Sequence, residues 1–76
     1  TGYALQAYWL ERLAKGEAAI LKILIDAYPN ALTRDAISEA TGYKRSSRDT
    51  YLQRLVAREL ISRTGSDVRA SDQLFS

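Results

Sequence analysis

The chain has 76 residues, 46% hydrophobic and 26% charged, and its 11 Lys and Arg residues against 9 Asp and Glu give a net charge of +2. This composition predicts a single globular domain and excludes a disordered segment, and no apolar run approaches the roughly 20 residues that a membrane-spanning helix needs. The absence of cysteine and histidine excludes a disulfide framework, the common zinc sites and catalysis by those residues, and it agrees with a cytoplasmic location.

The remaining polar residues give little support for an enzyme. Asp35 and Glu39 lie one helical turn apart near the start of a predicted helix, where carboxylates fit the helix dipole or plain solvation. The four glycines are isolated, so no glycine-rich phosphate loop is present. We therefore expect no catalytic activity, no cofactor and no metal site. Because the chain begins at Thr1 rather than at methionine, we also expect it to be a piece of a longer protein.

Residues 3–15 are predicted to form the first helix, because they are rich in Ala, Leu and Glu and lack β-branched side chains. One apolar line on this helix can cover the domain, which leaves a second line free to contact another copy, as in a homodimer, or the rest of a parent protein. The alternative is that the whole helix wraps into the core. We therefore treat 1–15 as a packing or dimerisation segment and 16–76 as the domain proper. The two lines are Leu5, Trp9 and Leu13, and Tyr3, Ala7, Leu10 and Ala14, the latter at the spacing of a coiled-coil seam.

A second helix is predicted after a break at Lys15-Gly16, beginning at Gly16 or Glu17. Pro29-Asn30 ends it, and Ala31-Leu32 is expected to pair with a later hairpin as a very short strand. The helix should be the central scaffold, because one face is apolar at helical spacing. That face is made of Ile20, Leu21, Leu24, Ile25 and Tyr28, widened by Ile23.

Two short helices joined by a glycine-centred turn are predicted between Leu32 and Ile61. Thr33 is a good N-cap for the first helix, and Gly42 suits the left-handed position that ends it. The second helix is expected to open at Ser46, with Ser46 and Asp49 forming a capping box. Its buried face would consist of Tyr51, Leu52, Leu55 and Val56, and its other residues include Ser47, Thr50, Gln53, Arg54 and Arg58. This layout is typical of a helix-turn-helix.

A short β-hairpin is predicted after these helices. Residues 60–63 and 68–70 have strand character, and 64–67 are strong turn formers. Arg63 and Arg69 flank the turn and can contact phosphates, although two ordinary exposed arginines would look the same. Ser71-Asp72 should cap a last helical turn that returns Leu74 and Phe75 to the core.

The run from Gly42 through the serines to Leu60-Ile61 resembles winged helix-turn-helix domains, most closely those of multiple-antibiotic-resistance-type bacterial repressors. The resemblance covers about the last two-thirds of the chain. It implies a mainly α fold: a three-helix core with a β-hairpin wing, here preceded by an extra N-terminal helix. In that family the second helix of the pair enters the DNA major groove, and the wing touches the neighbouring backbone.

Two residues depart from the family's pattern. Arg48 stands where the family usually has a small aliphatic residue, so we expect it to face the core with its head in solvent or on a phosphate. Glu59 stands where the family has glycine, which suggests that the helix ends without the usual left-handed glycine.

Positive charge is concentrated around the second helix of the pair. Residues 1–33 carry three basic and three acidic residues, whereas 44–58 carry five basic residues against Asp49 alone. Such a patch is the electrostatic footprint of a phosphate-backbone binder, although a solvated basic helix is the plain alternative.

The expected function is double-stranded DNA binding by a transcriptional regulator, or by the DNA-binding part of a larger bacterial or phage protein. Specific binding would require a dimer. The competing expectation is a winged-helix module that binds another protein. The cations expected to contact phosphates are Lys44, Arg45, Arg54, Arg63 and Arg69, and the residues expected to reach base edges are Ser46, Ser47, Thr50 and Gln53.

Overall fold

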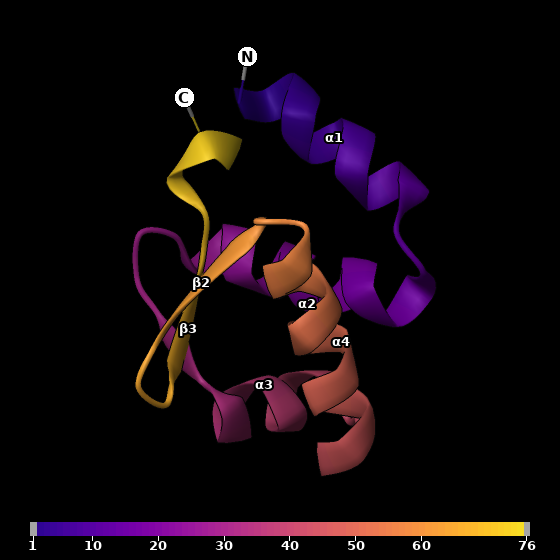
Figure 1. The fold of residues 1–76 in the computed structure, drawn as a ribbon, viewed down its shortest axis with the longest axis vertical. Coiled ribbons are helices and arrows are strands. Elements are labelled where there is room, and N and C mark those ends of the chain that lie inside the picture. The colour runs from indigo at the N-terminus through magenta and orange to yellow at the C-terminus, as the bar shows by residue number, and fades with distance from the viewer. Residues whose placement is uncertain (1, 76) are drawn as a thin grey trace.

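The computed structural model describes residues 2–75 and confirms a mainly helical fold with a small antiparallel sheet (Figure 1). The sheet has the strand order β1-β3-β2, so the last strand along the chain is the central one. The predicted segments 1–15 and 16–76 include residues 1 and 76, which lie outside the described part of the chain. The elements are α1 (Gly2–Arg12), α2 (Lys15–Ala27), β1 (Leu32–Thr33), α3 (Arg34–Thr41), α4 (Arg45–Ala57), β2 (Ile61–Thr64), β3 (Asp67–Ala70) and the 3-10 helix η1 (Asp72–Leu74).

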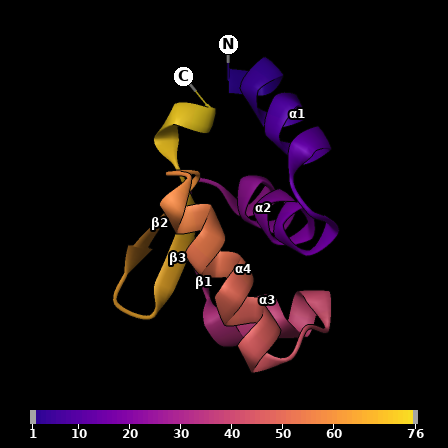
Figure 2. The same ribbon diagram turned by 45° about the vertical axis from the view of Figure 1, so that its right-hand side comes forward.

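Helix α2 is the scaffold on which the other elements pack, as its apolar periodicity predicts. Its residues Ile20, Leu21 and Leu24 are fully buried, and it contacts α1, α3, α4 and β3. Helices α1 and α3 lie on opposite sides of it (Figure 2). The core also receives Leu13, Ile37, Leu52, Leu55, Leu60, Ile61, Val68, Ala70 and Leu74.

The predicted break between the first two helices is placed too late. Helix α1 ends at Arg12, and α2 already begins at Lys15, so Gly16 lies inside the first turn of α2. A Cβ atom built on Gly16 would come within 2.5 Å of the Tyr51 ring. Glycine therefore serves close packing between α2 and α4 at this position rather than a helix break.

The two apolar lines of α1 have different surroundings. Leu13, just beyond the end of α1, is buried, and Leu5 and Trp9 are half-buried against the core, so every member of the first line packs, whereas Leu10 alone of the second line does. On the second line Leu10 is half-buried, whereas Ala7 and Ala14 are exposed and Tyr3 is 82% exposed.

The sheet confirms the predicted hairpin, with β2 starting one residue later than expected. The turn between β2 and β3 has Gly65 at a φ of 62°, a conformation that glycine adopts without strain. Strand β1 pairs with β3 over two residues, with Leu32 opposite Val68. Beyond β3, the Ser71 hydroxyl caps η1 as predicted, and Phe75 stacks on Tyr28 with 3.7 Å between ring centroids.

Candidate functional site

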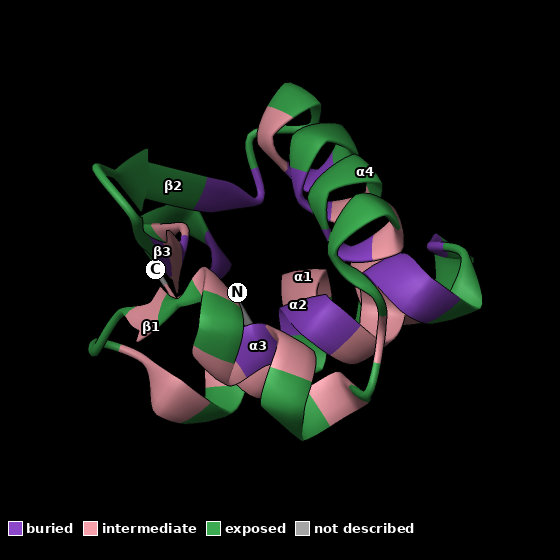
Figure 3. Ribbon diagram, turned by 90° about the horizontal axis from the view of Figure 1, so that it is seen from below, coloured by how far each residue is buried: buried purple, intermediate pink, exposed green. Residues whose placement is uncertain are grey.

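Helix α4 presents a polar face to solvent, and its N-terminal half lies at the end of the molecule away from α1 (Figure 1). Ser46, Thr50 and Gln53 are exposed, and their spacing places them on one side of the helix. Figure 3 shows exposed residues along the outward side of α4 and along most of β2. Lys44 and Arg45 are exposed at the start of the helix, and the Arg45 side chain is 88% exposed. The base-edge candidates are therefore accessible, except for Ser47, which is half-buried on the flank facing α2.

The expected capping box of Ser46 and Asp49 does not form. The N-cap is Lys44, two residues before Ser46, and it makes no side-chain capping bond, so Ser46 and Asp49 lie inside the helix rather than at the N-cap and N3 positions. The carboxylate of Asp49 instead accepts two hydrogen bonds from the Arg48 guanidinium, at 2.9 and 2.8 Å from Nε and Nη2. Asp49 is therefore held by a charged donor on the neighbouring residue.

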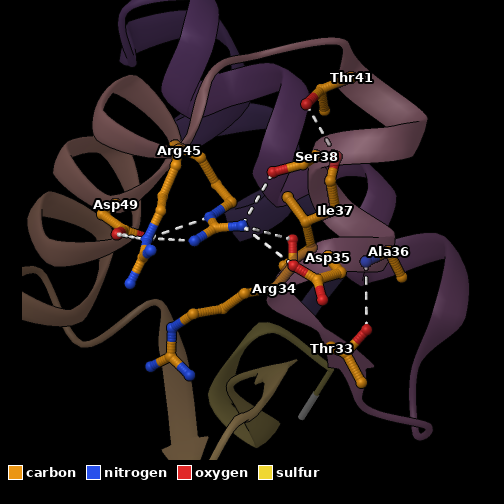
Figure 4. A network of polar contacts seen from close by, with 10 residues as sticks. Thr33, Arg34, Asp35, Ala36, Ile37, Ser38, Thr41, Arg45 and Asp49 are labelled. Carbon is orange, nitrogen blue, oxygen red and sulfur yellow. Dashed lines mark hydrogen bonds and ion pairs between the residues drawn. The ribbon is translucent and has the colours of Figure 1, made fainter.

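Arg48 faces the core, as the comparison with the family pattern predicts, but its head reaches neither solvent nor a surface position. The residue is only 5% exposed. Its Nη1 donates to the Arg34 carbonyl oxygen at 3.1 Å and to Ser38 Oγ at 2.9 Å, while Asp35 lies 3.8 Å away. Figure 4 shows this network between α3 and α4. Arg48 therefore ties the two helices together, and its charge is satisfied inside the chain.

Arg54 is held by an acidic residue that sequence reasoning missed. Its Nη1 lies 3.3 Å from Oε2 of Glu17 on α2, and the Glu17 side chain is only 4% exposed. The Arg54 side chain remains 58% exposed. Glu17 could have been noticed, because it precedes Leu21 by one helical turn and so falls on the buried face of α2.

The two arginines of the hairpin lie on opposite faces of the sheet. Arg63 is paired across the sheet with buried Val68, and it lines a hollow of about 250 Å³ together with Gln53 and Arg34. Arg69 lies on the other face, where it donates to Asp72 at 2.9 Å. The structure therefore brings Arg63 to α4 and places Arg69 away from it.

A small polar cluster surrounds Arg69. Hydrogen bonds from Arg69 and from Tyr28 lower the pKa of the Asp72 carboxyl below its ordinary value. The bond to Asp72, together with burial, raises the pKa of the Tyr28 hydroxyl. The cluster fixes η1 to the end of α2, which gives Arg69 a structural partner.

Arg34 is a further cation that sequence reasoning missed. It begins α3, and its Nη1 donates to the Gly65 carbonyl oxygen at the hairpin turn at 3.3 Å. A hollow of about 460 Å³ runs between Arg34, Arg45 and Ser66. The fold thus gathers arginines from α3, α4 and β2 beside the polar face of α4. In the sequence, Arg34 is marked only by its place directly after the Thr33 cap, and that place does not show which way its side chain points.

The site therefore combines exposed hydroxyl and amide groups with guanidinium groups, and the carboxylates of Asp35 and Asp49 line the same hollows. Within residues 2–75, no cluster of three or more acidic, Cys or His side chains is arranged to hold a metal ion. None of the described helices is long and apolar enough to cross a membrane. Comparison of the chain with protein-family models, curated proteins and solved structures finds no match.

Proposed function

We propose that this chain is a winged helix-turn-helix domain that binds double-stranded DNA, as a transcriptional regulator or as part of a larger regulatory protein. In this proposal α3 and α4 are the helix-turn-helix, α4 is the recognition helix, and β2 and β3 form the wing. The observation that supports it most is the exposed face of Ser46, Thr50 and Gln53, which projects from a rigid support and is not covered by α1.

In this proposal, DNA is bound through two kinds of contact, one to phosphates and one to base edges. Lys44, Arg45 and Arg63, joined by Arg34, neutralise phosphates on the side of α4 that faces the wing. Their contribution falls with salt, because binding releases counterions from the DNA. Ser46, Thr50 and Gln53 offer hydrogen bonds to base edges in the major groove.

A single copy binds weakly in this scheme, with a dissociation constant of about 10⁻⁴ to 10⁻⁶ M for non-specific DNA. Specific regulation requires a homodimer that presents two recognition helices to half-sites about 34 Å apart. The exposed line of α1, with Tyr3 82% exposed, is the surface proposed for that dimer.

A charge placed on the recognition face tests the proposal. Thr50→Glu adds a carboxylate at an exposed position, so the fold should survive while duplex binding falls by at least about tenfold, through repulsion of phosphates. Ser62→Glu makes the same charge change beside Arg69, on the face of the hairpin opposite Arg63 and α4, so this variant should bind DNA almost like the unmodified chain. Equal binding by the Thr50→Glu variant and the unmodified chain would remove α4 from the interface. Binding is measured by fluorescence anisotropy of a labelled duplex.

The second candidate is a protein-interaction module. One observation in its favour is the exposure of aromatic side chains on α1, where Tyr8 is 46% exposed and Tyr3 82%. Another is that Arg48 and Arg54 each form an ion pair within the chain, Arg48 with Asp49 and Arg54 with Glu17. This reading predicts no mobility shift with duplex DNA even at low salt, together with retention of a partner protein on a column that carries the chain.

A further inference from the structure

The ion pair between α2 and α4 leaves a buried carboxylate only half satisfied. Oε2 of Glu17 accepts from Arg54, but Oε1 is buried and has no hydrogen-bond partner among the described residues. A buried carboxylate is costly unless a cation stays beside it. The Arg54 guanidinium is therefore held in place, because leaving Glu17 would strand this charge.

Arg54 still has donors to offer on its other side. Its side chain is more than half exposed, and only Nη1 is used in the bond to Glu17. A guanidinium carries five N–H donors in a rigid fork, so it can hold one anion while it binds a second. Glu17 thus fixes the direction in which the free donors point.

Those donors border a shallow hollow on the α2 side of α4. It measures about 330 Å³ and is lined by Ser46, Ser47, Thr50, Tyr51 and Arg54. Four of these residues carry hydroxyl groups, one carries a guanidinium, and no carboxylate is among them. Thr50 Oγ1 already donates to the Ser46 carbonyl, and Ser46 belongs to the face proposed to read bases, which leaves Ser47, Tyr51 and Arg54 as candidate donors to a ligand. A lining of this kind suits an anion.

We propose that this hollow is a subsite for one phosphate group of the DNA backbone, and that Glu17 is a positioning residue that holds Arg54 in it. The proposal rests on the DNA-binding function above. It assigns the two DNA strands to different flanks of α4. The cations beside the wing supply net charge, and the neutral Glu17–Arg54 pair supplies fixed hydrogen-bond geometry.

Charge-conserving substitutions separate geometry from charge. Arg54→Lys keeps the charge but removes the fork, so binding to a short random-sequence duplex should weaken about fivefold, the equivalent of one hydrogen bond. Arg12→Lys is the matched control, because Arg12 is exposed at the end of α1 and lies outside the proposed interface, and it should bind like the unmodified chain. Both are measured by fluorescence anisotropy at one salt concentration.

Glu17→Gln tests the positioning role through coupling. Without the Glu17 carboxylate, the Arg54 guanidinium is no longer fixed. Changing Arg54 to lysine in the Glu17→Gln protein should therefore lower duplex affinity by less than about twofold. Glu39→Gln removes an exposed charge from α3 and should leave the fivefold effect intact. A melting curve checks the fold of each variant. If Glu17→Gln does not fold, the Nε–Hε resonance of Arg54 in the unmodified chain decides: it shifts on addition of duplex if the subsite is correct and stays in place if it is not.

Three results would be informative in different ways. The fivefold loss together with its disappearance in Glu17→Gln supports the subsite. Duplex binding that is unaffected by Arg54→Lys overturns the subsite and leaves the DNA-binding function standing. An unmodified chain that binds no duplex at low salt overturns both.

Discussion

At the scale of single residues, Glu59 carries a conformation that side chains rarely adopt. Its φ is 61°, and the chain around it closes α4 with the two bonds of a Schellman motif. Leu60 N–H donates to the Leu55 carbonyl at 3.1 Å, and Glu59 N–H donates to the Val56 carbonyl at 2.9 Å. The helix therefore keeps the left-handed ending of the resembled family without its glycine. The packing of Leu60 and Leu55 in the core, together with these bonds, holds the position.

Replacing Glu59 with glycine should stabilise the fold. Glycine relieves the left-handed strain, which outweighs its greater freedom in the unfolded chain, so we expect a gain of about 0.5 to 1 kcal/mol in the free energy of unfolding. Glu59→Ala keeps a Cβ atom and should give no gain. Urea denaturation of the three proteins measures both changes, and a less stable Glu59→Gly protein would contradict this account of the helix end.

Arg48 should contribute far more to the stability of the fold than Arg45, which is exposed at the start of the same helix. Arg48→Ala removes the guanidinium that joins α3 to α4 and leaves Ser38 and the Arg34 carbonyl without its bonds, so we expect a loss of about 2 to 4 kcal/mol. Arg45→Ala at the exposed helix start should change the free energy of unfolding by less than about 0.5 kcal/mol. Similar losses for the two variants would show that the network contributes little.

At the scale of elements, the Arg69–Asp72–Tyr28 cluster links the hairpin, η1 and the end of α2. Tyr28 donates to Asp72 Oδ1 at 2.7 Å, and Arg69 donates to both carboxylate oxygens of Asp72. Since the folded state lowers the pKa of Asp72, this group contributes stability above its unfolded pKa. That contribution is lost as the pH falls through the lowered, folded value.

The cluster predicts an acid-dependent difference between two proteins. As the pH falls below the ordinary pKa of an aspartate and through the lowered pKa of Asp72, the unmodified chain should lose free energy of unfolding that an Asp72→Asn protein does not lose, because asparagine has no proton to take up. Denaturant titrations at several pH values compare the slopes. Parallel curves for the two proteins would mean that the cluster does not hold η1 in solution.

The elements were predictable where apolar periodicity and turn chemistry agree. The scaffold helix, the Thr33 cap, the Gly42 turn and the hairpin all follow from such local signals. The break before α2 was misplaced because Gly16 was read as a helix breaker, whereas its reason is the Tyr51 ring on a distant helix. The predicted capping box is wrong because α4 has Lys44 as its N-cap, which places Ser46 and Asp49 inside the helix, where Asp49 pairs with Arg48 instead.

For the molecule as a whole, the sequence was enough to locate the polar face of α4. It did not show where the basic side chains around that face lie or which of them form ion pairs within the chain. Helical spacing is enough to group Ser46, Thr50 and Gln53. It cannot show that Arg54 pairs with Glu17 across 37 residues of chain, or that Arg69 lies on the outer face of the sheet. It also gave no reason to place Arg34 beside Arg45. These relations depend on how helices and strands pack together, which is information that no single stretch of sequence contains.

The salt dependence of duplex binding tests whether α4 and the cations beside it bind DNA. Anisotropy of a labelled random-sequence duplex is measured with the unmodified chain between about 50 and 200 mM salt. We predict a linear fall of log affinity with log salt, of slope about −3 to −4, because each of Arg34, Lys44, Arg45 and Arg63 contributes about 0.9. No binding at the lowest salt, or binding that does not change with salt, would contradict it.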